Sequence, residues 1–144
     1  MEERLVIFGS IFTVSNRLQL VMDQHMPQLS AKQWFVLTML SFFHTPPSLI
    51  GLAKACDSSY QNIKQIVLKL EEKGFVTLKD DLSDKRAKCV AMTSKFSQWN
   101  TKTQEQSAQF VDTLFECLSP VQISDLKNSL LALHEKLGDM QYEK

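Results

Sequence analysis

The chain has 144 residues, of which 44% are hydrophobic and 22% charged, and its formal net charge is zero. This composition excludes a disordered chain and is typical of one globular domain that buries a core. No uninterrupted apolar run reaches the roughly 20 residues of a membrane-spanning helix, and the N-terminus lacks a basic secretory signal, so we expect a cytoplasmic protein. The three cysteines, Cys56, Cys89 and Cys117, are odd in number and widely spaced, which excludes a disulfide framework.

The charge is unevenly distributed along the chain. Residues 54–95 contain nine lysines and arginines against six aspartates and glutamates, a net charge of +3, so the remaining residues carry −3. A basic segment of this kind favours contact with a polyanion, although solvated surface charge gives the same pattern.

Two helices are predicted in the first third of the chain. Residues 4–25 have apolar side chains at a wide helical period, and we expect this helix to be heavily buried. Pro27 ends it, and Ser30 with Gln33 forms a capping-box signature for a second helix that runs to about Phe43. The apolar positions of the first helix are Leu5, Phe8, Ile11, Phe12, Leu18 and Met22.

A short helix from Leu49 to Cys56 precedes a longer one, for which Asp57, Ser58 and Ser59 are all candidate N-caps. Ser58 has the capping-box spacing to Gln61. The longer helix has one face typical of a core, and Gly74 follows it as a left-handed stop. The core-facing positions are Ile63, Ile66, Val67 and Leu70, the opposite positions are Gln61, Gln65, Leu68 and Glu72, and Lys64 and Lys69 flank the latter.

Two alternating segments, Phe75–Lys79 and Lys88–Met92, surround a polar run and predict a β-hairpin. Helix resumes after Thr93. Ser119 and Pro120 then form an N-cap followed by proline at the first helical position, which opens a last helix to about Met140. Its apolar residues recur every three or four positions, a stripe that requires a partner helix. They are Ile123, Leu126, Leu130, Leu133, Leu137 and Met140.

This order of helix, turn, amide-rich helix and charged hairpin is that of a winged helix-turn-helix, in which the second helix enters the DNA major groove. Glutamine side chains carry a donor and an acceptor that match the edge of adenine, and lysines contact guanine or phosphate. The other reading is that these side chains only solvate an outer face.

Residues 52–93 also resemble the core of the multiple-antibiotic-resistance regulators, the MarR family of bacterial transcription factors. The matches are Leu52-Ala53, Ser59, Leu70-Glu71 followed by Lys73-Gly74-Phe75-Val76, Asp81, Asp84-x-Arg86, and Val90-x-Met92-Thr93. The sequence departs from the family pattern at Ser58, Gln65, Leu68, Ser83 and Phe96.

The resemblance implies a mainly α fold with a small β-hairpin wing, in which one domain spans residues 1–144. It implies a winged helix-turn-helix core at about 31–93 and dimerisation helices at about 4–25 and 94–141. The expected function is that of a homodimeric repressor of a near-palindromic operator. The expected DNA-contacting residues are Ser59, Gln61, Lys64, Gln65, Lys69, Asp84, Lys85, Arg86 and Lys88, with Arg86 in the minor groove and Asp84 ordering the wing. The expected dimerisation residues are Leu5, Phe8, Phe12, Ile123, Leu126, Leu130, Leu133 and Leu137.

Such regulators commonly respond to a small molecule that binds between the dimer helices and the winged domain. The candidate lining residues are Trp34, Met39, Phe42, Phe43, His44 and Trp99, for each of which core packing is the favoured explanation. Oxidation of a cysteine is the rival signal, with Cys89 expected to be exposed and Cys56 and Cys117 to be core residues.

The sequence favours neither a cofactor nor an enzyme. His25, His44 and His134 have no metal-ligand spacing, and no catalytic motif is present. The remaining alternative from another class is a winged-helix protein-interaction module, or a dimeric scaffold that does not bind specific DNA.

Overall fold

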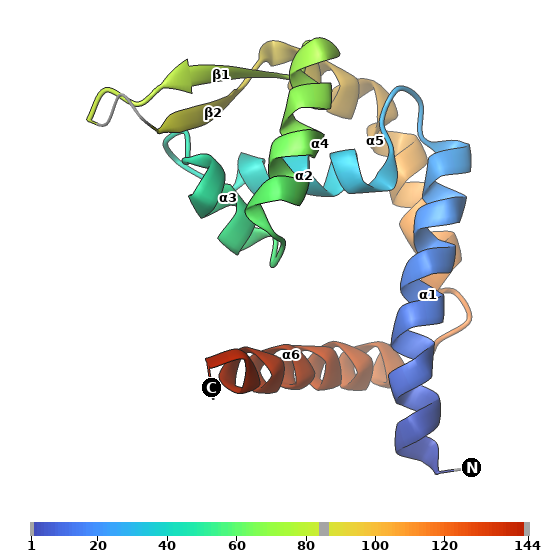
Figure 1. Ribbon diagram of the computed structural model, residues 1–144. Coiled ribbons are helices and arrows are strands. Elements are labelled where there is room, and N and C mark those ends of the chain that lie inside the picture. Colours follow the sequence, from blue (N-terminus) through green and yellow to red (C-terminus); the bar gives the residue numbers. More distant parts are fainter. Residues whose placement is uncertain (1, 84–86, 143–144) are drawn as a thin grey trace. The chain divides into compact units, whose positions relative to one another are not determined.

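The computed structural model describes residues 2–83 and 87–142 (Figure 1). The chain separates into two compact units, Met1–Trp99 and Asn100–Lys144. The elements in chain order are α1 (Glu3–His25), α2 (Ala31–Ser41), α3 (Leu49–Ala55), α4 (Tyr60–Glu72), β1 (Val76–Asp80), β2 (Lys88–Met92), α5 (Ser94–Phe115) and α6 (Pro120–Tyr142). The mainly helical fold with one hairpin between α4 and α5 confirms the fold class expected from the sequence.

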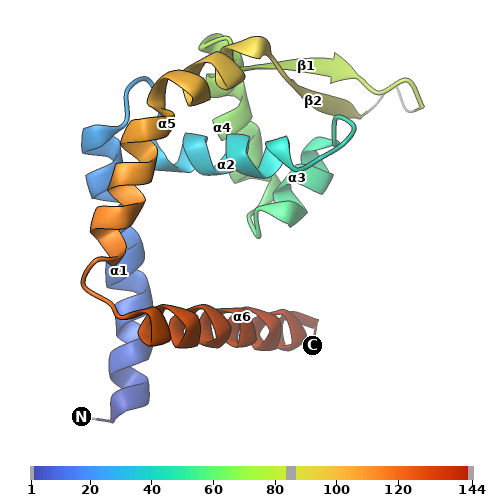
Figure 2. The same ribbon diagram turned by 180° about the vertical axis from the view of Figure 1, so that it is seen from behind.

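The core of the first unit lies where α2, α3 and α4 meet the hairpin. In Figure 2 the molecule is seen from behind, with α2 in front of α4. The largest fully buried side chains of the core come from each of these elements, so the elements share one core. They are Phe75, Leu37, Leu52, Ile63, Leu70, Val36, Val67, Val76 and Val90.

Helix starts follow the local capping chemistry. Ser30 Oγ accepts from Gln33 N at 3.2 Å and Gln33 Oε1 accepts from Ser30 N at 3.1 Å, which confirms the predicted capping box of α2. At α4 the expected box at Ser58 is wrong. Ser59 is the N-cap and accepts from Asn62 N at 3.2 Å, because the chain is still turning at Asp57, whose φ is 50°.

The hairpin is antiparallel, with Val76 opposite Met92 and Asp80 opposite Lys88. Its base is joined to the end of α4, since Phe75 N donates to Leu70 O at 2.9 Å and Thr93 N donates to Phe75 O at 2.9 Å. Gly74 makes this junction with φ of 84°, in the left-handed region that the sequence predicted.

Gly74→Ala is therefore expected to lower the free energy of unfolding by about 1 kcal/mol. A Cβ at this position meets nothing closer than Lys95 Cδ at 3.7 Å, so the cost comes from the backbone angle and not from a clash. Urea denaturation measures the loss. Gly74→Asn serves as the control and should lose less, because asparagine tolerates this conformation; equal losses would contradict the explanation.

The first helix differs most from expectation. No residue of α1 is buried, although the sequence predicted heavy burial. Within the first unit α1 packs against α2, and most of its large apolar side chains are exposed. They are Leu5, Val6, Ile7, Phe8, Ile11, Phe12, Val14 and Leu20.

By length and composition alone, α1 is also long and apolar enough to cross a membrane, with a mean hydropathy of 1.5. The sequence expectation that no segment meets this criterion is wrong, because the polar residues that interrupt its apolar runs are mostly uncharged. A helix that binds a second helix through a wide apolar surface meets the same criterion.

The second unit contains the remainder of α5 and the whole of α6. Ser119 and Gln122 form a capping box at the start of α6, with Gln122 N donating to Ser119 Oγ at 3.2 Å and Ser119 N to Gln122 Oε1 at 2.9 Å. The predicted apolar stripe is present but exposed. Its members are Ile123, Leu126, Leu130, Leu133, Leu137 and Met140.

Candidate nucleic-acid interface and the adjoining pocket

The outer face of α4 is free of contacts with the rest of the core. Ile63, Val67 and Leu70 are buried and hold the helix against α2 and α3. The residues predicted to point outward are all exposed, which confirms the orientation of the helix read from its period. They are Gln61, Gln65, Leu68 and Glu72, together with Lys64 and Lys69.

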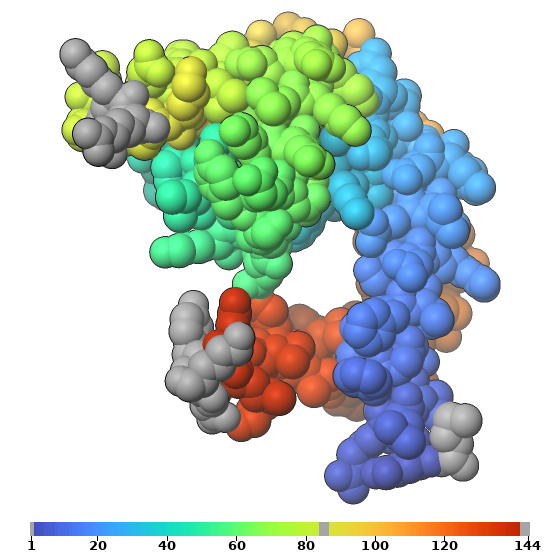
Figure 3. Space-filling view, in the orientation of Figure 1, coloured from blue at the N-terminus to red at the C-terminus, as the bar shows by residue number. Residues whose placement is uncertain are grey.

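The hairpin continues this surface. Figure 3 shows α4 in green and the hairpin in yellow-green on the same face of the molecule. Lys88 is exposed, and its Nζ lies 3.6 Å from Asp80 Oδ1. Asp81 Oδ1 accepts from both Ser83 N at 2.9 Å and Ser83 Oγ at 2.8 Å, which closes a turn near the tip. The predicted contact residues Asp84, Lys85 and Arg86 lie outside the described residues.

Two further polar residues at the start of α4 were absent from the predicted contact set. Tyr60 is exposed at the first helical position, directly after the cap Ser59. It stands four residues before Lys64, so the same helical period that selected Lys64 would have found it. Asn62 is exposed too, but its Nδ2 donates to Ser58 Oγ at 2.7 Å and turns it toward a pocket instead.

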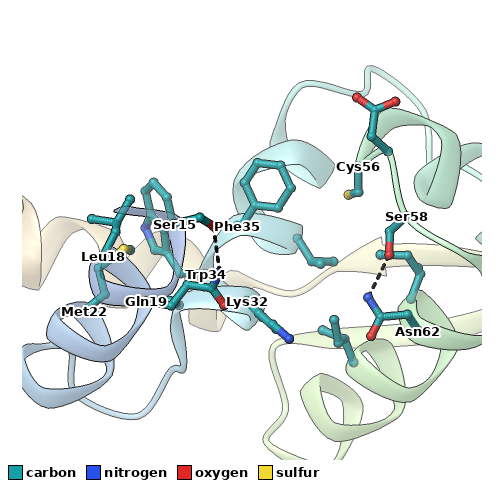
Figure 4. Close-up of a pocket in the computed structure, with 15 residues that line it drawn as sticks. Ser15, Leu18, Gln19, Met22, Lys32, Trp34, Phe35, Cys56, Ser58 and Asn62 are labelled. Carbon is teal, nitrogen blue, oxygen red and sulfur yellow. Dashed lines mark hydrogen bonds between the residues drawn. The ribbon is translucent and has the colours of Figure 1, made fainter. Parts of the chain in front are cut away.

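This pocket has a volume of about 530 Å³ and lies among α1, α2 and the start of α4, all within the first unit. Figure 4 shows its α1 side chains facing Ser58 and Asn62 across Phe35. The apolar lining includes Leu18, Met22, Trp34, Phe35, Ile63 and Ile66, and the polar lining includes Ser15, Gln19, Lys32, Asp57, Ser58 and Asn62.

A molecule in this pocket would contact residues that hold the start of α4. Asn62 donates from its side chain to Ser58 and from its backbone N to the cap Ser59 at 3.2 Å. On the opposite wall, Gln19 Nε2 donates to Ser15 Oγ at 3.2 Å. A few polar groups beside an apolar lining are the usual composition of a small-molecule site.

Of the aromatic and methionine residues expected to line a pocket, Trp34 does so. Trp99 is a core residue, and its Nε1 donates to Pro27 O at 2.8 Å. Met39 packs against the core. Phe42, Phe43 and His44 are exposed in the connection after α2, because that helix ends at Ser41.

The cysteines also differ in part from expectation. Cys56 is buried as predicted, and its burial, followed by the charge of Asp57, raises the pKa of its thiol. Cys117 is exposed and not a core residue, because α5 ends at Phe115 and leaves it in a turn. Cys89 is half-buried, and partial burial, followed by the neighbouring Asp81, raises the pKa of its thiol. Neither Cys56 nor Cys89 has the lowered pKa of a reactive thiol.

Within residues 2–83 and 87–142, no group of three or more histidine, cysteine, aspartate and glutamate residues could hold a metal ion. The exposed face of α4 carries side chains suited to binding nucleic acid. Exposed amides and lysines on a firmly packed helix match base edges and phosphates.

No model of a known protein family matches the sequence. Solved structures match over nearly the full length. A MarR/EmrR family transcriptional regulator from Acinetobacter sp. ADP1 has a TM-score of 0.80 and 17% identity, with 96% of this chain and 99% of that chain covered. A MarR family regulator from Streptomyces coelicolor, solved in complex with DNA, has a TM-score of 0.80 and 19% identity, with coverages of 95% and 92%.

An organohalide-sensing transcriptional regulator bound to 2,4-dichlorophenol has a TM-score of 0.88 and 15% identity, with 99% of this chain and 86% of that chain covered. These identities are low, but TM-scores of 0.80 to 0.88 over most of each chain show a shared fold. The chain therefore has the winged helix-turn-helix fold of the MarR family transcriptional regulators.

Proposed function

We propose that the protein is a sequence-specific, DNA-binding transcriptional regulator that acts inside the cell as a homodimer. The observation that carries this proposal is the division of α4 into two faces. One face buries Ile63, Val67 and Leu70, and the other presents Gln61, Gln65 and Lys64 to solvent beside the hairpin. A helix held in this way can enter a major groove without disturbing its own core.

The exposed apolar residues of α1 and α6 support the dimer. Monomeric proteins rarely leave apolar surfaces of this extent uncovered, and a second copy of the chain offers a matching apolar surface. The set includes the predicted residues Leu5, Phe8, Phe12, Ile123, Leu126, Leu130, Leu133 and Leu137. On this proposal α1 is covered by protein and not by lipid.

We further propose that the protein is a repressor that a small aromatic compound releases from DNA. The support is the pocket, whose Trp34 and Phe35 suit an aromatic ring and whose Lys32 suits an anionic or phenolic substituent. A matched structure of the same fold holds 2,4-dichlorophenol. Such a ligand would contact Asn62 and Ser58 and so act on the start of α4.

Selection of binding sites from random double-stranded DNA, at fixed near-physiological salt, tests the function directly. We expect an inverted repeat whose half-sites lie about one helical turn apart. If no sequence is enriched, either without ligand or with substituted phenols and benzoates, specific DNA binding is refuted. The remaining function is then that of a protein-interaction module.

Gln65→Ala is expected to weaken binding to the selected site by about 1–3 kcal/mol and to change binding to random DNA little, because glutamine reads a base edge. Lys69→Ala is the comparison: it should weaken binding to both DNAs and lower the slope of log affinity against log salt by about one. Titrations at several salt concentrations measure both. Equal losses on the two DNAs would make Gln65 a backbone contact.

A further inference from the structure

The connection between α1 and α2, residues 26–30, is fixed by side chains from three helices. Asp23 Oδ1 of α1 accepts from Ala31 N at 2.6 Å, directly after the connection. Trp99 Nε1 of α5 donates to Pro27 O at 2.8 Å. Within the connection Gln28 has φ of 70°, a conformation that glutamine adopts only when its surroundings impose it.

The third contact comes from Lys73, the residue that caps the C-terminus of α4. Its Nζ donates to Gln28 O at 2.7 Å and to Gln33 Oε1 at 2.8 Å. These acceptors lie 45 and 40 residues away in the sequence, so Lys73 joins the end of one helix to the start of another.

Gln33 links the Lys73 contact to the start of α2. Its side chain is buried, and the same Oε1 atom accepts from Ser30 N at 3.1 Å to complete the capping box of α2. The ammonium group of Lys73 therefore binds the atom that fixes the start of α2 and the carbonyl group that precedes it. Hydrogen bonds from a charged donor are stronger than those between neutral groups.

The backbone of Lys73 is equally constrained. Its N donates to Lys69 O at 3.1 Å, inside α4, and its carbonyl oxygen accepts a hydrogen bond from Lys95 Nζ. Lys95 Nζ also lies 4.7 Å from the ring centroid of Phe75. A displacement of the connection between α1 and α2 would therefore be transmitted through the Lys73 side chain to the end of α4.

We infer that Lys73 is a positioning residue that sets the orientation of α4 relative to α1, and not a phosphate contact as its place on this helix suggests. The inference rests on the proposed function, in which α1 contributes to the dimer and α4 reads DNA. Two recognition helices must meet half-sites at a fixed spacing, so their orientation relative to the dimer helices governs affinity.

Hydrogen–deuterium exchange on the full chain tests the contact without DNA. Lys73→Met removes the donors and keeps the apolar stem. It is expected to speed exchange about fivefold to tenfold, both at residues 29–31 and in the C-terminal half of α4. Lys54→Met, which removes another exposed lysine, on α3, is the control and should leave both segments unchanged.

A second variant tests the same contact if Lys73→Met is poorly folded. Gln33→Glu keeps an acceptor for Ser30 N and adds a charge opposite Lys73. It is expected to slow exchange at the end of α4, and to do so much less in a chain that also carries Lys73→Met. An equal effect of Gln33→Glu with and without Lys73→Met would overturn the inference. So would a Lys73→Met variant in which exchange is faster at residues 29–31 but unchanged at the end of α4.

Binding to the selected DNA site then separates positioning from phosphate contact. Lys73→Met should weaken binding about tenfold with an unchanged salt slope, whereas Lys69→Met should lower the slope by about one. A lower slope for Lys73→Met would make it a phosphate contact and refute the inference. If the unaltered protein binds no specific DNA, the proposed function fails, and hydrogen exchange alone decides the role of Lys73.

Discussion

Leu130→Asp is expected to turn the protein from a dimer into a monomer. Leu130 lies in the middle of the α6 stripe and is 50% exposed in the single chain, so a partner copy must cover it in the proposed dimer. Each copy would then bury an unpaired carboxylate, and we expect the dissociation constant to rise roughly 100-fold or more. Sedimentation velocity over a range of concentrations measures this change.

Asn128→Asp is the matched control. It adds the same charge two residues away, about 200° around the helix, where α6 carries polar residues, and it should leave the dimer intact. Circular dichroism separates dissociation from unfolding, and Leu130→Ala serves if the aspartate variant does not fold. A Leu130→Asp chain that sediments as a dimer at all concentrations would show that this stripe is not the interface.

Phe75→Ala is expected to lower the free energy of unfolding by about 3–5 kcal/mol, as is typical of a large cavity in a core. The Phe75 side chain is 0% exposed, its backbone joins the end of α4 to the base of the hairpin, and Lys95 lies over its ring. Since a domain of this size is stable by only about 5–15 kcal/mol, much of the stability would be lost. Urea denaturation monitored by circular dichroism measures it.

Phe42→Ala removes the same side chain where it is 71% exposed and is expected to cost less than about 0.5 kcal/mol. Comparison of the two variants separates the loss of stability caused by burial of the ring from that caused by removing an aromatic side chain. A loss at Phe75 no larger than that at Phe42 would contradict the position of the core between α4 and the hairpin.

The sequence predicted those parts of the fold that depend on local chemistry. The capping box at Ser30, the N-cap at Ser119, the left-handed Gly74 and the buried positions of α4 all follow from local sequence patterns, which a helix converts into contacts. Even so, the sequence left Asp57, Ser58 and Ser59 open as N-caps of α4, and the capping-box spacing favoured Ser58 although Ser59 is the cap. The chain turns at Asp57 with a positive φ, and no pattern of apolar residues signals this.

The features that the sequence did not predict depend on contacts between distant segments. Burial of α1 was expected because its residues are apolar, but apolar character does not say whether the covering surface belongs to the same chain. Trp34 and Trp99 were both candidates for the pocket, yet Trp34 lines it and Trp99 is a core residue that donates to Pro27 O. The bonds from Lys73 to Gln28 and Gln33 have no local signal at all.

The two faces of α4 have an evolutionary consequence under the proposed function. Asn62, Ile63 and Ile66 point into the pocket, while Gln61, Gln65 and Leu68 are exposed on the helix. Substitutions in one set can therefore change the preferred operator while the other set keeps the preferred inducer. Duplicated copies of such a gene could acquire new targets and retain their old signal, or the reverse, through changes within about two turns of the same helix.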